Sequence, residues 1–178
     1  MILLVVDTQK GITDERLHEF ERLKSSITTL ISEARKAGVE VVYVRHDDGP
    51  GTGFSVGDDE FEIYDEFAPE EKERIFDKKV NSAFHNSTGL VEYLTEKSEN
   101  KVMLVGLQTN FCIDATIKSG FEQGYEMIVP EYANSTFDNE YMKKDICYHY
   151  YNDFIWPERY ARCVTMEEAV RELRKERR

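Results

Sequence analysis

Three polar residues in this sequence have side chains that could act together in catalysis. Asp7 directly follows an apolar run of five residues, Lys78 lies near the end of a long irregular segment, and Cys112 follows another apolar run. A carboxylate can serve as a general base, a thiol as a nucleophile, and an ammonium group can stabilise the anions that form. These residue types predict acyl-transfer chemistry if the fold brings them together.

Cys112 lies where a strand-like segment gives way to a helical pattern, in the turn 106–112. A thiol in the first turn of a helix is close to the positive end of the helix dipole and to free backbone amides, which lower its pKa. The same amides can hold an oxyanion. We therefore expect an activated nucleophile; the alternative is a small buried structural residue, the role expected for Cys163.

Asp7 and Lys78 also have simpler interpretations. Asp7 could cap the next helix, but that helix begins further on, near Asp14, which is the better cap. Lys78 and its neighbour Lys79 could both lie on the solvated surface. Successive side chains of an extended segment point to opposite faces, so at most one of the two lysines can reach the same site as Asp7 and Cys112.

The elements that must position these residues alternate between strands and helices. Apolar runs predict strands at 2–6, 39–44, 102–105, 127–129 and 162–164, and helical periodicity predicts helices at 17–34, 90–97, 110–123 and 139–152. Thr165 and Glu168 form a capping box that begins a terminal helix. This alternation predicts an α/β fold, a three-layer α/β/α sandwich with a mostly parallel, Rossmann-like central sheet. In such sheets ligands bind at the carboxyl ends of the strands.

Length and charge narrow the class of protein further. The 178 residues suit one domain spanning 1–178. With 23 basic and 35 acidic residues, the net charge of −12 disfavours nucleic acid and membrane surfaces as partners. No apolar run is long enough to span a bilayer or to form a signal peptide, and three cysteines do not form a disulfide framework. We therefore expect a cytoplasmic protein.

Three segments of the chain resemble the signature segments of the isochorismatase-like cysteine hydrolases, which include the nicotinamidase/isochorismatase-like amidohydrolases. The first is Asp7-Thr8-Gln9, and the second is Lys78 placed four residues before Ser82-Ala83-Phe84. The third runs from Gly106 to Thr116 and contains Cys112. The segments occur in the family's order and spacing across nearly the whole chain.

The resemblance implies roles for specific residues. Asp7, Lys78 and Cys112 would form a catalytic triad, and a cis peptide bond between Leu107 and Gln108 would turn the amides of Gln108 and Cys112 toward the substrate as an oxyanion hole. The implied reaction is hydrolysis of a small-molecule amide or related C–N bond through a Cys thioester, without a cofactor. Two alternatives remain open: isochorismate-type vinyl-ether hydrolysis, and a non-catalytic binding module or thiol sensor that kept the fold.

Metal binding and oligomerisation are the last features that the resemblance addresses. Nicotinamidase-like members bind a divalent metal through an Asp-x-His pair, which this chain lacks. We predict no metal, although His46 and His85 are residues that could ligate one. Related hydrolases form dimers or larger oligomers, so we expect a homodimer or higher homo-oligomer. The aromatic run from Tyr148 to Trp156 could line either the pocket or an interface.

Overall fold

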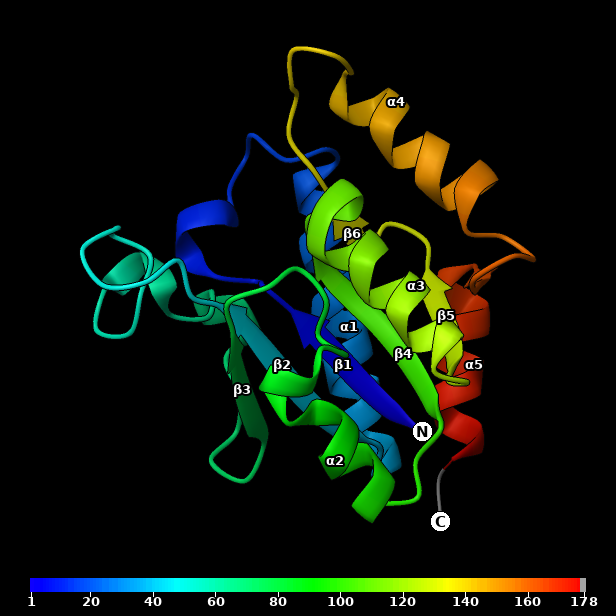
Figure 1. The fold of residues 1–178 in the computed structure, drawn as a ribbon. Coiled ribbons are helices and arrows are strands. Elements are labelled where there is room, and N and C mark those ends of the chain that lie inside the picture. Colours follow the sequence, from blue (N-terminus) through cyan, green and yellow to red (C-terminus); the bar gives the residue numbers. More distant parts are fainter. Residues whose placement is uncertain (177–178) are drawn as a thin grey trace.

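The protein is built on a central sheet of parallel strands (Figure 1). The structure is a computed structural model and describes residues 1–176. Along the sheet the strands follow the order β3-β2-β1-β4-β5-β7, and the short β6 pairs with β4. Their bounds are β1 Ile2–Val6, β2 Glu40–His46, β3 Arg74–Lys78, β4 Lys101–Leu107, β5 Glu126–Pro130, β6 Asn134–Ser135 and β7 Arg162–Val164. The strand order reverses between β1 and β4, and such a reversal opens a crevice at the carboxyl ends of the strands.

Helices cover both faces of the sheet, and this confirms the predicted three-layer α/β/α architecture. α1 (Phe20–Ala37) and α5 (Met166–Lys175) pack on one face. α2 (Leu90–Glu96) and α3 (Asp114–Glu122) pack on the other, and α4 (Lys144–His149) lies beyond the carboxyl edge, on the side of α3 (Figure 1). None of the helices within residues 1–176 has the length and apolar character needed to cross a bilayer.

β1 shows why the sheet forms where the sequence predicts it. All five of its side chains are fully buried. Leu3 and Val5 pack in the core under α1 and α5, whereas Ile2, Leu4 and Val6 pack in the core under α2 and α3. A strand covered on both faces needs an uninterrupted apolar sequence, and residues 2–6 supply it.

The structure differs from the predicted elements in the segments where apolar periodicity is weak. The sequence predicts an irregular segment at 45–73 and assigns no strand after it, although Ile75 and Phe76 suggest that the chain enters the sheet edge there. The structure forms β3 at this edge, with mostly exposed side chains. The helix predicted from residue 110 begins as a π-helical turn at Thr109–Ile113 and becomes α-helical only at Asp114. The helix predicted over 139–152 begins at Lys144 and ends in a π-helical stretch at Tyr150–Ile155.

The terminal helix begins as predicted. The Thr165 hydroxyl accepts a hydrogen bond from the Glu168 amide at 3.2 Å, and the Glu168 carboxylate accepts one from the Thr165 amide at 2.9 Å. This capping box satisfies amides that would otherwise have no partner in the first turn of α5.

Candidate active site

The structure brings Asp7, Lys78 and Cys112 together at the carboxyl edge of the sheet. Asp7 directly follows β1, Lys78 is the last residue of β3, and Cys112 lies in the π-helical turn after β4. The Lys78 Nζ lies 2.7 Å from the Asp7 Oδ2 and 3.2 Å from the Cys112 Sγ. All three residues are buried. A single ammonium group therefore donates hydrogen bonds to both a carboxylate and a thiol.

The backbone around the switch point of the sheet explains how Asp7 and Cys112 come so close. Asp7 adopts a left-handed conformation with φ of 51°, which aspartate tolerates better than most residues, and its amide donates to the Val44 carbonyl at 2.8 Å. Gly106 in β4 lies so close to β1 that a Cβ there would be only 1.9 Å from the Val6 carbonyl oxygen. Only glycine permits this approach. The Leu107–Gln108 peptide bond that follows is cis, as the resemblance implied.

The two neighbouring lysines have different environments. Lys78 pairs in register with His46 of β2, and its side chain is fully buried. The Lys79 side chain is 69% exposed, and its Nζ lies 3.7 Å from an Asp47 carboxylate oxygen. The alternation of an extended segment therefore sends Lys78 into the site and Lys79 to the surface.

The ionisation of the site differs from the sequence-based expectation. Burial, reinforced by the nearby Asp7 carboxylate, raises the pKa of the Cys112 thiol to about 12, against the opposing effect of Lys78. The prediction of a lowered thiol pKa is therefore wrong for this structure, because loss of water around the sulfur outweighs the helix terminus and the ammonium group. The resting thiol keeps its proton and needs a base to remove it.

Asp7 is placed to be that base. Burial raises the pKa of its carboxyl group, although Lys78 opposes the shift. A base works best when its pKa lies near the working pH, so this direction suits proton transfer. The Asp7 Oδ2 accepts from Lys78, whereas the Oδ1 is buried and has no hydrogen-bond partner among residues 1–176. The free oxygen is available for the thiol proton.

Gln9, His46 and Asn81 also lie at the site, and the sequence analysis did not place them beside Asp7, Lys78 and Cys112. Gln9 is fully buried, and its side-chain amide bonds to the backbone of His46 and to the Phe61 carbonyl. His46 contacts Lys78, with 3.0 Å between Nδ1 and Nζ. The Asn81 Oδ1 lies 3.9 Å from the Cys112 Sγ. Periodicity could not place these three residues, because the chain leaves the extended conformation at Asp7, directly after β1.

The two histidines considered as metal ligands lie apart: His46 is at the candidate active site and His85 is on the surface. Asp7, His46 and Cys112 offer ligand atoms that lie within 4.8 Å of one another. The Lys78 Nζ, however, hydrogen-bonds to all three of them. An ammonium group thus holds the position between these side chains, and a divalent ion beside it would meet a second positive charge. His85 is exposed and bonds with Ser87 instead. The residues present therefore do not fit a metal ion.

The aromatic run near α4 divides between the core and the surface. Trp156 is fully buried and its Nε1 donates to the Asp114 carboxylate at 2.9 Å. Tyr148 is also buried, and its hydroxyl accepts from the Tyr132 amide. Tyr150 and Phe154 are exposed. Part of the run thus stabilises the fold, and part remains on the surface.

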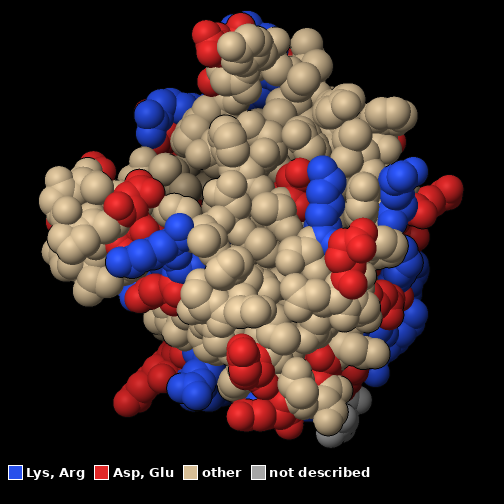
Figure 2. Space-filling model, in the orientation of Figure 1, with Lys and Arg blue, Asp and Glu red and all other residues tan. Residues whose placement is uncertain are grey.

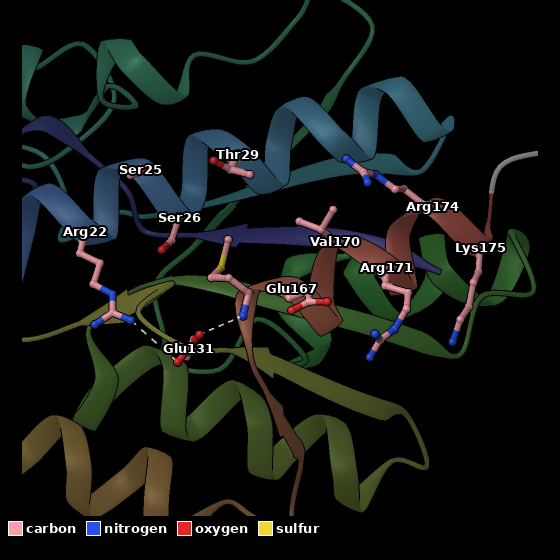
Figure 3. Close-up of a pocket in the computed structure, with 11 residues that line it drawn as sticks. Arg22, Ser25, Ser26, Thr29, Glu131, Glu167, Val170, Arg171, Arg174 and Lys175 are labelled. Atoms are coloured by element: carbon pink, nitrogen blue, oxygen red, sulfur yellow. Dashed lines mark hydrogen bonds and ion pairs between the residues drawn. The ribbon is translucent and has the colours of Figure 1, made fainter.

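A separate groove of about 840 Å³ lies between α1 and α5 (Figure 3). Its basic side chains pair with acids around it: Arg22 lies 4.0 Å from Glu131, and Arg174 lies 2.8 Å from Glu33. None of the residues that line it belongs to the Asp7, Lys78 and Cys112 site. The groove is therefore separate from the candidate active site at the carboxyl edge.

A doubly wound parallel sheet with a carboxylate, an ammonium group and a thiol at its switch point defines the class: an α/β protein with a candidate hydrolase site. The chain belongs to the isochorismatase family of hydrolases, because the family model of the Isochorismatase domain matches residues 1–170.

Individual relatives agree with this assignment. The chain is 30% identical over 135 residues to the "Secreted isochorismatase effector Isc1" of Verticillium dahliae, which covers 74% of this chain and 70% of the relative. It is 26% identical over 155 residues to "Nicotinamidase 3" of Arabidopsis thaliana, covering 78% and 74%. The structure of a cysteine hydrolase from Pseudomonas syringae pv. phaseolicola matches with a TM-score of 0.89 and 23% identity, over 98% of this chain and 92% of that one. This last similarity supports the fold.

Proposed function

We propose that the protein is a cysteine hydrolase that cleaves an amide or related C–N bond of a small molecule through a thioester on Cys112. The observation that carries the proposal is the Lys78 ammonium group, which bonds at once to the Asp7 carboxylate and to the Cys112 thiol. This arrangement combines a base, a nucleophile and a fixed positive charge within one buried site. The nicotinamidase relative, by its name, acts on an amide.

The proposed reaction begins with proton transfer. The free Oδ1 of Asp7 takes the proton of the Cys112 thiol while the sulfur attacks the substrate carbonyl carbon. Lys78 favours the thiolate as it forms, and the amides of Gln108 and Cys112 hold the oxyanion. Asp7 then gives its proton to the leaving amine. Water, activated by Asp7, cleaves the thioester and restores the thiol.

Vinyl-ether hydrolysis of isochorismate is the alternative within the family. It requires acid chemistry, for which a raised Asp7 pKa is also suitable, but it gives no role to the thiol. The thiol is therefore the feature that favours C–N bond cleavage over vinyl-ether hydrolysis.

A binding module or thiol sensor is the alternative from another class. Sensor cysteines need an accessible thiol with a low pKa. Cys112 is buried, and burial together with Asp7 raises its pKa to about 12. These properties favour catalysis in which attack and deprotonation are coupled.

Domain organisation, assembly, location and partners are also part of the proposed function. We propose one hydrolase domain over 1–178 that works as a homodimer or larger assembly in the cytoplasm, although the Verticillium relative is named as secreted. We further propose that its partner is a small molecule, with no nucleic acid or membrane. On the face shown in Figure 2, basic side chains lie among acidic ones, which is not the pattern of a phosphate-binding surface.

The test is a panel of small amides, ureides and isochorismate, assayed for release of ammonia or acid. We expect turnover of at least one C–N substrate, loss of that turnover in Cys112→Ala, and an acyl adduct on Cys112 by intact mass. Thermal unfolding checks that the variant is folded. Substantial amide cleavage by Cys112→Ala would exclude the thioester route. Cleavage of isochorismate alone would favour the vinyl-ether alternative.

A further inference from the structure

The Lys78 ammonium group makes three hydrogen bonds, and the reaction proposed above uses only two of them. It donates to the Asp7 Oδ2 at 2.7 Å, to the Cys112 Sγ at 3.2 Å, and contacts the His46 Nδ1 at 3.0 Å. An ammonium group has three N–H donors and no acceptor. Its third donor therefore requires a lone pair on the His46 Nδ1, and the hydrogen bond itself assigns the tautomer of the ring.

The other nitrogen of His46 supports the same tautomer. The His46 Nε2 lies 3.2 Å from the Asp48 Oδ1. A neutral imidazole with a bare Nδ1 carries its proton on Nε2 and can donate it to this carboxylate. The His46 ring thus lies between the half-exposed Asp48 carboxylate and the buried Lys78 ammonium group.

The backbone holds the His46 ring in place. His46 and Lys78 are register partners at the carboxyl ends of β2 and β3, so their side chains lie side by side. The Gln9 amide bonds to both the N–H and the C=O of His46, at 2.7 and 2.9 Å. Gln9 is fully buried, which makes this clamp rigid. The position of the imidazole next to Nζ is therefore built into the sheet edge.

We propose that His46 is a positioning residue of the hydrolase site: it accepts the third N–H of Lys78 and so directs the other two toward Asp7 and Cys112. This inference rests on the proposed function and assigns it a further residue. Without an acceptor at this position, the ammonium group can rotate about its last bond, and its hydrogen bonds to the reacting groups become less well ordered.

The experiment compares His46→Asn with His46→Leu in the full chain. The amide oxygen of asparagine can lie where Nδ1 lies and accept from Lys78, whereas leucine has similar bulk and no acceptor. His149→Leu is the control, because His149 is exposed and pairs with Asp153 away from the site. We measure kcat and KM on the amide found in the panel, and the rate of Cys112 alkylation by iodoacetamide with peptide mapping.

We expect His46→Leu to lower kcat by roughly 10- to 100-fold with little change in KM, as losses of supporting hydrogen bonds do elsewhere. His46→Asn should recover most of that loss, because its amide oxygen can accept the hydrogen bond from Lys78. Cys112 alkylation should be slower in His46→Leu than in the wild type and His46→Asn. His149→Leu should match the wild type in every measurement.

Equal rates for His46→Leu and the wild type would overturn the inference, as would an asparagine variant no better than the leucine variant. Should His46→Leu fail to fold, His46→Ala, which also lacks an acceptor, takes its place: rates equal to those of the wild type would contradict a role for the imidazole. Should the wild type cleave no amide, the proposed function fails, but the order of the alkylation rates still tests His46.

Discussion

Two hydrogen bonds join the side-chain amide of Gln9 to the backbone N–H and C=O of His46. The Gln9 Oε1 accepts from the His46 N–H at 2.7 Å, and its Nε2 donates to the His46 carbonyl at 2.9 Å and to the Phe61 carbonyl at 2.9 Å. The side chain therefore joins the ends of β1 and β2 to the long loop. Because Asp7 lies two residues before Gln9, and His46 beside Lys78, this clamp also fixes the distance between the base and the ammonium group.

Replacing the clamp should destabilise the protein. In Gln9→Leu, one buried N–H and two carbonyls lose their partner, each at a cost of about 1–3 kcal/mol when no water replaces it. We expect the free energy of unfolding to fall by roughly 3 kcal/mol in urea titrations, together with activity. Gln123→Leu removes an exposed side chain after α3 that donates to the Phe84 carbonyl at 3.1 Å, and should change it by no more than about 1 kcal/mol. Equal stabilities of the two variants would contradict the clamp.

The two lysines should behave differently when each is changed to alanine. Lys78→Ala removes the positive charge that opposes the rise in the pKa of Cys112, so we expect kcat/KM to fall by orders of magnitude. Cys112 alkylation should also shift to higher pH. Lys79→Ala removes a side chain that is 69% exposed and should change stability by no more than about 0.5 kcal/mol. An inactive Lys79→Ala beside an active Lys78→Ala would mean that the wrong lysine has been assigned.

The free energy of unfolding should decrease at alkaline pH because Cys112 has a raised pKa in the folded protein. Its pKa rises from 9.0 to about 12 on folding, so between these values the folded protein keeps a proton that the unfolded chain releases. Stability therefore falls as pH rises through this window, by on the order of 1 kcal/mol for this thiol between pH 9 and pH 10. Urea unfolding at both pH values measures the loss. Cys112→Ala should show a smaller loss than the wild type, and Lys79→Ala the same loss; an unchanged slope in Cys112→Ala would contradict the raised pKa.

Chelation should leave the rate unchanged. The Lys78 ammonium group holds the centre of the group formed by Asp7, His46 and Cys112, so carbonyl polarisation falls to backbone amides rather than to a metal ion. The measurement is the rate on a cleaved amide before and after prolonged treatment with a chelator and dialysis. Loss of activity that returns only with added zinc, iron or manganese would contradict this prediction, and His46 would then be the first residue to test as a ligand.

The sequence by itself determined the class of fold and the chemical groups of the site. The apolar run at 2–6 predicts a strand buried on both faces, and the alternation of strands and helices predicts a parallel sheet with helices on each side. The position of Asp7 after that strand, and of Cys112 after β4, placed both at one edge of the sheet. Local periodicity carries this information because it reflects which face of each element is buried.

Only the tertiary structure decided how these groups are protonated and supported. β3 has too few apolar residues to be predicted, yet its pairing with β2 buries Lys78 beside His46. The pKa of Cys112 rises because burial removes water from the thiol, and burial depends on elements far apart in the chain. The third hydrogen bond of Lys78 likewise depends on strand register. Ionisation and hydrogen-bond geometry respond to every neighbour in space, and no local sequence pattern records those neighbours.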